Sequence, residues 1–175
     1  FFNYGLKHHW AQSNPANGIA APKSAKKLPK TLDADQINQF LSLSPNSWID
    51  CRDHAMIELL YSSGLRLAEL TNLNLTDIDL KEAITGKGNK TRQLPVGRQA
   101  LSAVKSWLKR RQELKNTEGS ALFLSKHGKR LSPRSIQDRL KQMSIKQGMP
   151  GKVHPHMLRH SFASHLLESS GDLRA

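Results

Sequence analysis

Residues 154–170 are the stretch that most constrains how this chain can fold. Pro155 suits the first turn of a helix and Gly171 is placed to end one, so the spacing predicts a helix between them. At 3.6 residues per turn, one apolar stripe runs along this helix, formed by Leu158, Phe162, Ala163 and Leu166. The rest of the chain must therefore supply a core against which the stripe packs.

His156 and Arg159 lie three residues apart in the same stretch, which predicts that they emerge together on one flank of the helix. An imidazole and a guanidinium are poor core groups, but both donate hydrogen bonds that suit an anionic oxygen. We interpret this pair as the centre of an anion site to which other cations are brought.

Arg66 is the second candidate cation, and it lies in the apolar run 65–70 that follows Gly64. A surface arginine is usually solvated, but the flanking leucines favour an arginine that is held and paired. Glu69, three residues further on, is the group expected to orient it.

Residues 83–95 predict a β-hairpin, with strands at 83–85 and 91–95. Lys87 lies at its tip between two glycines, with Lys90 and Arg92 beside it. A Gly-Lys-Gly tip lets the backbone and the ammonium group approach a phosphate together or enter a groove. Polar hairpin tips commonly contain a lysine, so the hairpin alone is a weak indication of phosphate binding. Together with Arg66 and the 154–170 helix it becomes a substantial one.

Two further helices are predicted before Arg66. The first starts after Thr31 or Asp33 as its N-cap, has an apolar face and ends by Pro45; its apolar residues are Ile37, Phe40 and Leu41. The second covers about residues 49–63 and stops at Gly64. Its predicted buried face consists of Ala55, Met56, Leu59 and Leu60.

Two more helices are predicted after the hairpin, at 98–116 and 132–148. The first has an apolar face of Leu101, Val104, Trp107, Leu108 and Leu114, and an exposed basic face of Lys105, Lys109, Arg110 and Arg111. The second has apolar Ile136, Leu140, Met143 and Ile145, and solvated Arg134, Arg139, Lys141 and Lys146. With a loop at 76–80 and a short strand at 122–124, the fold class is α+β, mainly helical, with a small antiparallel sheet.

The charge of the chain is concentrated in one segment. There are 27 Lys+Arg and 14 Asp+Glu, a net charge of +13, and residues 81–152 alone hold 18 of the basic and 4 of the acidic residues. A solubilising surface normally intersperses both signs, so a basic block favours binding to a phosphate backbone. No apolar run approaches the length of a membrane span, and the single cysteine, Cys51, fits a reducing, cytoplasmic setting.

Arg66, Lys87, His156 and Arg159 together predict phosphoryl transfer. Two arginines can hold the non-bridging oxygens of a phosphate, a histidine can move a proton, and a lysine can protonate a leaving alkoxide. Metal-dependent transfer would need clustered carboxylates, and the acidic pairs at 33/35 and 77/79 look like a helix cap and a loop. We therefore expect neither a metal nor another cofactor.

The histidines and tyrosines outside this set receive structural interpretations. His156, His160 and His165 have a spacing that invites zinc, but no HExxH glutamate and no cysteine pair accompany them. His160 and His165 are therefore interpreted as structural or surface histidines. Tyr4 and Tyr61, the only tyrosines, lie in helix patterns with apolar neighbours and are expected to pack in cores.

Three ordered motifs resemble one known family. Gly64–Leu70 (GLRLAEL), Gly86–Lys90 (GKGNK) and His154–Ala163 (HPHMLRHSFA) are similar, in order and spacing, to the signatures of tyrosine recombinases, and within them to the Xer branch. The ending at 167–174 and the segment from Asn14 to Lys23 resemble the XerC group of that branch.

The resemblance implies roles for individual residues. Arg66 and Arg159 match the two catalytic arginines, His156 matches the histidine between them, and Lys87 matches a hairpin lysine that acts as general acid. Glu69 is implied as the acid that supports Arg66, while Lys90 and Arg92 are implied in DNA binding beside Lys87.

The resemblance also implies an activity and partners. The family cuts and rejoins double-stranded DNA through a 3′-phosphotyrosyl intermediate, without metal or nucleotide, in a tetramer. For the Xer branch this implies a dif-type site, a second recombinase of the XerD type, an FtsK-type DNA translocase as activator, and chromosome dimer resolution. A phage- or mobile-element integrase of the same chemistry, or a DNA-binding module without catalysis, remain the alternatives.

The sequence departs from the family pattern in two places. The family has its nucleophilic tyrosine beyond the positions that match Arg174 and Ala175, so we expect this polypeptide to bind DNA and form the phosphate site without cleaving. The interval from Arg66 to Lys87 is about three residues shorter than expected, which fits a short first strand.

The resemblance divides the chain into three parts. Residues 1–13 are expected to be the tail of an N-terminal core-binding, SAM-like domain. Residues 14–30 are expected to be an interdomain linker, with an ordinary surface loop as the alternative. Residues 31–175 are expected to be the catalytic domain.

Overall fold

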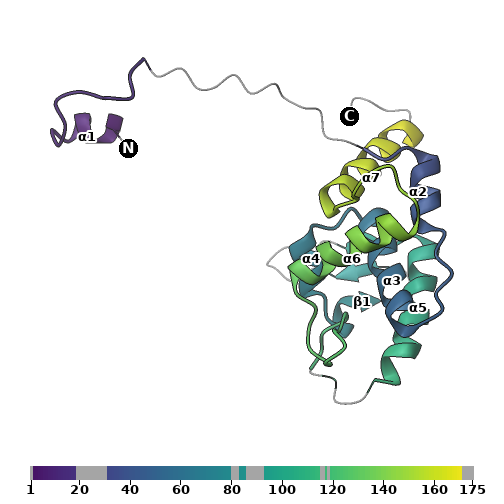
Figure 1. Cartoon of the computed structure of the whole chain (residues 1–175). Coiled ribbons are helices and arrows are strands. Elements are labelled where there is room, and N and C mark those ends of the chain that lie inside the picture. Colours follow the sequence, from purple (N-terminus) through teal and green to yellow (C-terminus); the bar gives the residue numbers. More distant parts are fainter. Residues whose placement is uncertain are drawn as a thin grey trace.

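The computed structural model describes residues 2–18, 31–79, 83–85, 93–114, 117 and 119–170. The described part of the chain is mainly helical, as predicted (Figure 1). Its elements are α1 (Phe2–Lys7), α2 (Ala34–Leu41), α3 (Trp48–Ser62), α4 (Leu67–Asn72), a 3-10 turn η1 (Leu75–Asp77), β1 (Ile78–Asp79), β2 (Ala83–Thr85), β3 (Gln93–Pro95), α5 (Arg98–Gln112), α6 (Pro133–Lys146) and α7 (Pro155–Ser170).

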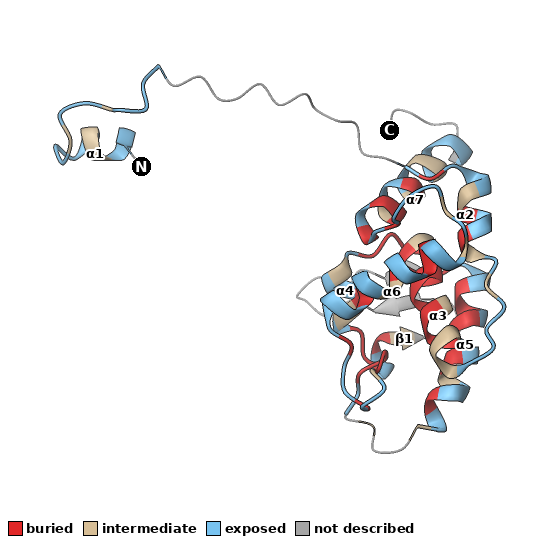
Figure 2. Ribbon diagram, in the orientation of Figure 1, coloured by how far each residue is buried: buried red, intermediate tan, exposed pale blue. Residues whose placement is uncertain are grey.

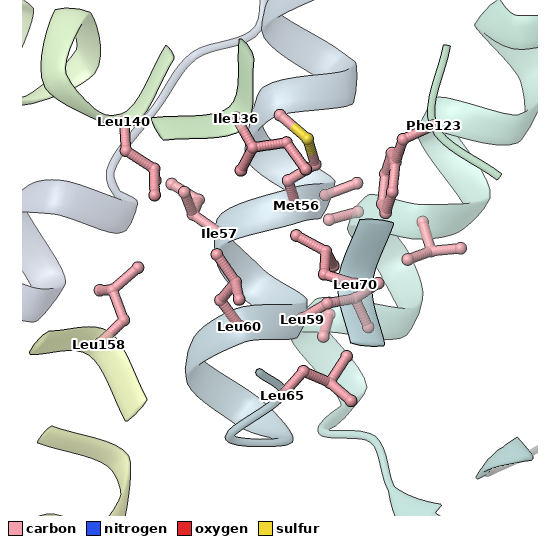
Figure 3. Close-up of a cluster of buried hydrophobic side chains, with 14 of the residues drawn as sticks. Met56, Ile57, Leu59, Leu60, Leu65, Leu70, Phe123, Ile136, Leu140 and Leu158 are labelled. Atoms are coloured by element: carbon pink, nitrogen blue, oxygen red, sulfur yellow. The ribbon is translucent and has the colours of Figure 1, made fainter. Parts of the chain in front are cut away.

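Helix α3 lies at the centre of the fold and contacts α2, α4, α5, α6 and α7. Its predicted buried face is confirmed, and burial extends around the helix to Ile57 and to the charged residues Arg52, Asp53 and Glu58. Figure 3 shows Met56, Ile57, Leu59 and Leu60 of α3 surrounded by side chains from neighbouring segments. In Figure 2 the ribbon of α3 is mostly red, whereas the surrounding helices carry both red and pale blue segments.

Arg52 and Asp53 are accommodated at this centre because their charges are paired. Asp53 Oδ1 accepts hydrogen bonds from Nε and Nη2 of Arg52 at 2.9 and 2.7 Å, and Asp53 Oδ2 accepts one from Arg139 Nε at 2.5 Å. Arg52 Nη1 donates a hydrogen bond to the Leu124 carbonyl at 2.8 Å. Arg139 was predicted to be solvated, but α6 packs on α3 so that its guanidinium meets this buried carboxylate.

Three short strands form an antiparallel sheet in the order β1-β2-β3. Ile78 pairs with Ile84, and Ile84 pairs with Leu94. The predicted loop at 76–80 is therefore wrong in part, because η1 and β1 occupy it and β1 extends the sheet by one strand. Lys87, Lys90 and Arg92 lie outside the described residues.

Helix α7 begins at Pro155 as predicted, but its apolar stripe is buried only in the first half. Leu158 is fully buried and Phe162 is half-buried, whereas Ala163 is exposed and Leu166 is 53% exposed. The buried half is fixed by Ser161, whose Oγ accepts a hydrogen bond from the Leu32 amide at 2.8 Å, just before α2. The predicted stripe is thus wrong for its second half, where Ala163 and Leu166 are exposed although His165 still contacts α3.

Besides Arg139, the predicted faces of α5 and α6 are wrong at two residues, Arg111 and Ile145. Arg111 was predicted to be exposed but is buried, because its Nη2 donates to the Ala121 carbonyl at 2.8 Å as the chain folds back over the end of α5. Ile145, predicted on the apolar face, is 71% exposed near the end of α6. Residues 122–124 are buried, but they form a bend between isolated bridges at Ala121 and Leu124 rather than a strand.

Helix α2 begins and ends where the sequence predicts. Asp33 is the N-cap of α2 and accepts a hydrogen bond from the Gln36 amide at 2.8 Å, and α2 ends before Pro45. Helix α1 has no buried residue, and Tyr4 is exposed rather than packed in a core within the described part of the chain. The three-part division at residues 13 and 30 remains a prediction.

None of the helices in the described part of the chain combines the length and the apolar composition that crossing a bilayer requires.

Candidate functional site

The candidate site is built on the turn between α3 and α4. Gly64 follows the C-cap of α3 with a φ of +55°, a left-handed conformation that glycine adopts without steric cost. Arg66, two residues after Gly64, is the N-cap residue of α4. The sequence predicted this stop from the glycine alone.

Arg66 and Glu69 are paired as their spacing predicted. The Arg66 amide donates to Glu69 Oε2 at 2.7 Å, and Arg66 Nη1 donates to Glu69 Oε1 at 3.1 Å. The Arg66 side chain is nevertheless 64% exposed, so it is held on one side and open to solvent on the other. An arginine in this state retains donors for a ligand.

Arg159 reaches the same turn from α7. Its Nη1 donates a hydrogen bond to the Gly64 carbonyl, which links residues 95 positions apart. The Phe162 ring lies against Gly64 so closely that a Cβ built there would be 2.6 Å from Phe162 Cδ1. The absence of a side chain at Gly64 therefore lets α7 approach α3 and bring Arg159 to the turn.

The charges of Arg66 and Arg159 act on the carboxylate of Glu69. Burial alone would raise the pKa of Glu69, but hydrogen bonds from the Arg66 backbone and side chain, and the charges of Arg66 and Arg159, lower it overall. The structure thus brings the two predicted arginines and the predicted supporting acid into one cluster.

His156 is exposed on the first turn of α7, beside two other histidines. The pKa of His154 is lowered by partial burial and by the charges of His156 and His160, which places the three imidazoles in one neighbourhood. His156 lies on the same helix as Arg159. Within the described residues it makes no hydrogen bond to Arg159 or to Arg66.

His165 lies further along α7 and has a structural contact. Its Nδ1 is 3.0 Å from the hydroxyl of Tyr61 on α3, which ties the two helices together. The pKa of Tyr61 is raised by burial and by the charge of Glu58. Among the described residues, no group of three or more His, Cys, Asp or Glu side chains is placed to hold a metal ion.

The assembled groups can bind an oxyanion that lies beside Arg66 and Arg159. Two guanidinium groups provide planar, always-charged donors that match phosphate oxygens. Sequence reasoning missed the part played by Gly64 and Phe162, whose contact sets the approach of α7 to the turn. A glycine before the arginine motif and an aromatic residue three positions after Arg159 were the available signals.

The comparison with protein families gives the class of this chain. Residues 30–175 match the Phage integrase family, and this match covers most of the chain, which therefore belongs to that family.

Similar proteins narrow the resemblance. The chain is 56% identical to the tyrosine recombinase XerC of Alcanivorax borkumensis over 181 residues, and 49% identical to the tyrosine recombinase XerC of Escherichia coli O157:H7 over 177 residues. These alignments include 100% and 99% of this chain, and it spans 59% of the length of each relative. The predicted resemblance to the Xer branch, and to XerC within it, is confirmed.

Solved structures agree with this class. The crystal structure of XerA recombinase superposes with a TM-score of 0.75 at 30% identity, covering 85% of this chain and 54% of that one. The XerH site-specific recombinase bound to its difH substrate gives a TM-score of 0.69 at 25% identity, covering 84% and 45%. The Tn1549 transposon integrase, at 18% identity and a TM-score of 0.77, shares the fold.

Proposed function

We propose that this chain is the phosphate-binding part of a site-specific DNA recombinase that works through a 3′-phosphotyrosyl intermediate. The observation that supports this most directly is the convergence of Arg66 and Arg159 on the Gly64 turn, with Glu69 paired to Arg66. Phosphodiester transfer develops negative charge on the non-bridging oxygens, and two fixed guanidinium groups stabilise it.

The proposed step divides the work among the named residues. A tyrosine oxygen attacks the phosphorus, the bond from phosphorus to the 5′-oxygen breaks, and the 5′-hydroxyl leaves with one added proton. Lys87 supplies that proton, His156 donates a hydrogen bond to the phosphate or moves the nucleophile's proton, and Lys90 and Arg92 bind the DNA beside Lys87. The reverse attack by another 5′-hydroxyl rejoins the strand.

The nucleophile is proposed to be a tyrosine other than Tyr4 and Tyr61, the only two in these 175 residues. The Tyr61 hydroxyl is bonded to His165, and burial raises its pKa, so it is disfavoured as a phenolate. Tyr4 lies on α1, whereas Arg66 is the N-cap of α4 and Arg159 lies on α7. We therefore expect the family's nucleophile at a position beyond the match to Arg174 and Ala175.

The substrate and partners are proposed from the similarity to the Xer branch. We propose a dif-type DNA site, a tetramer with a second, XerD-type recombinase, an FtsK-type translocase and a role in chromosome dimer resolution. The similarity to XerC over the whole chain favours this over a mobile-element integrase.

The test uses a nicked duplex that traps the covalent intermediate. The 175-residue chain should bind this DNA without forming an adduct, and a longer protein that includes the family's tyrosine should form one. In the longer protein, Arg66→Ala and Arg159→Ala should abolish the adduct, a loss of about 100-fold or more for groups that act on the transition state, while most of the DNA affinity remains.

Arg110→Ala is the matched control, because Arg110 is also exposed and paired three residues on, with Glu113 at 3.3 Å. It should leave the adduct yield unchanged. Adducts that persist in both Arg66→Ala and Arg159→Ala would show that the site is assigned wrongly. An adduct on Tyr4 or Tyr61 would contradict the proposed nucleophile.

A further inference from the structure

A hollow of about 430 Å³ opens between α2, α3 and α5, and none of the residues of the arginine site lines it. Helix α3 contacts both α2 and α5, so the hollow lies where these three helices meet. Its volume falls within the range of roughly 300–1,000 Å³ that is usual for ligand sites. The proposed recombination chemistry gives it no role.

The hollow has a buried carboxylate in its wall. Glu58 of α3 is 5% exposed, and within the described residues its only polar partner is His54 Nε2, at 3.5 Å. A buried carboxylate normally accepts several good hydrogen bonds, because desolvating the charge is costly. Glu58 is among the residues that line the hollow, so the acceptor capacity that His54 leaves unused is available to a ligand bound there.

The remaining lining suits a ligand with an apolar stem and a charged end. Leu41, Pro45 and Ala103 provide apolar surface. The rest of the wall consists of Cys51, His54 and the neutral polar residues Asn38, Ser42, Gln99, Ser102 and Ser106. No lysine or arginine is among these described lining residues, although the chain as a whole has a net charge of +13.

We propose that this hollow binds a guanidinium or alkylammonium group at the end of an aliphatic chain, with Glu58 as its counter-ion. The cation would give the Glu58 carboxylate the charge-assisted hydrogen bonds that His54 alone does not supply. The aliphatic stem would lie on the apolar residues, as the stems of lysine and arginine do elsewhere. The group can come from a free small molecule or from an arginine side chain of a peptide.

Binding can be measured by amide NMR on the 175-residue chain with three probes: butylguanidinium, N-acetyl-arginine amide and the neutral analogue butylurea. Butylguanidinium should shift the amides around Glu58, His54 and Gln99 in a saturable way, and butylurea should bind at least tenfold more weakly, because it cannot make the charge-assisted bond. Tighter binding of N-acetyl-arginine amide than of butylguanidinium would assign the peptide source, and the reverse order would assign the free small molecule.

Two variants test the assignment of the site. Glu58→Gln should weaken butylguanidinium binding by roughly tenfold or more. Ser102→Leu should narrow the hollow and weaken binding while Glu58 is kept, so the proposal stays testable if Glu58→Gln does not fold. Glu113→Gln is the control. It removes an equal charge from an exposed ion pair at the end of α5, outside the hollow, and should leave binding unchanged.

Equal binding of butylguanidinium and butylurea would overturn the proposal. So would unchanged affinity in a folded Glu58→Gln variant, or shifts confined to amides outside the hollow. None of these outcomes depends on DNA cleavage, so the proposal stands or falls separately from the recombinase function.

Discussion

Gly64 affects both the backbone and the site, because its left-handed conformation turns the chain and its missing side chain leaves room for Phe162. Its carbonyl also receives the hydrogen bond from Arg159. A substitution at this one residue therefore acts on α3, α7 and the arginine pair together. Arg66 and Glu69, by contrast, interact within a single turn of chain and depend less on distant packing.

We expect Gly64→Ala to destabilise the fold by more than the conformational cost of alanine at positive φ, which is about 1–2 kcal/mol. A further loss of about 1–3 kcal/mol should come from displacing Phe162, as in overpacked cores. Gly148→Ala is the matched control, because Gly148 also follows a helix at a φ of +62° and its nearest added contact is at 3.9 Å. Urea denaturation measures both, and equal losses would show that the Phe162 contact has no energetic weight.

Glu69 should make stability depend on pH. Its pKa is lowered in the folded state, so its ionised form contributes stability at neutral pH that is lost as the pH falls through and below the usual glutamate range. The difference in unfolding free energy between the natural chain and Glu69→Gln should thus be constant above about pH 5 and shrink in more acidic solution. A difference that stays constant down to acid unfolding would contradict the ionic role of Glu69.

At the scale of the element, α7 is held to the core at several points along its length. Met157 and Leu158 are buried, Ser161 Oγ accepts the Leu32 amide, and His165 meets Tyr61 of α3. Leu166 and Leu167 in the second half are exposed, so Arg159 is positioned mainly by the buried contacts of the first half, with His165 as one further contact beyond it.

Ser161→Ala should destabilise the chain by about 1–3 kcal/mol, because it leaves the buried Leu32 amide without its acceptor. Ser169→Ala, on the exposed end of the same helix, removes only a local bond to the Leu166 carbonyl and should have a much smaller effect. Thermal unfolding of the two variants makes the comparison. Similar losses in both would mean that the bond from Leu32 to Ser161 does not hold α7 in place.

The helices and the local part of the site could be predicted because they depend on neighbouring residues. Periodicity identified the buried face of α3, and three-residue spacing identified the pair of Arg66 and Glu69. Arg111 and Ile145 could not be predicted, because whether a helix end is covered depends on segments elsewhere in the chain. The bond from Arg159 to Gly64 and the contact of Phe162 are likewise tertiary, and no spacing rule links residues so far apart.

The chain has a net charge of +13, and in the part that the structure describes some lysines and arginines have no carboxylate partner. Arg52, Arg111 and Arg130 donate to protein groups, but exposed cations remain on α5 and α6, including Lys105, Lys109 and Lys141. This distribution favours a sizeable electrostatic component in DNA binding.

We expect the affinity of the chain for duplex DNA to fall steeply as salt is raised from about 50 to 200 mM, with a slope in log-log form of roughly 0.9 per phosphate contact. Lys141→Gln should reduce that slope, because it removes an exposed cation that can contact a phosphate. Arg130→Gln should instead lower the stability of the fold, because Arg130 donates to the Thr71 and Leu73 carbonyls. Titrations with a labelled duplex at several salt concentrations provide the slopes. An affinity insensitive to salt would contradict electrostatic binding.

The position of α3 has a consequence for how the chain opens. Every helix from α2 to α7 contacts α3, and most of its middle residues are shielded, so solvent can reach its backbone only when several neighbours separate at once. Its amides should consequently be the slowest in the chain to exchange with deuterium, at the rate of global unfolding, whereas the exposed end of α7 should exchange through local fraying. The turn at Gly64 is connected to both kinds of opening. It follows directly on α3, which should open last, and it is bonded to α7, whose far end should open early.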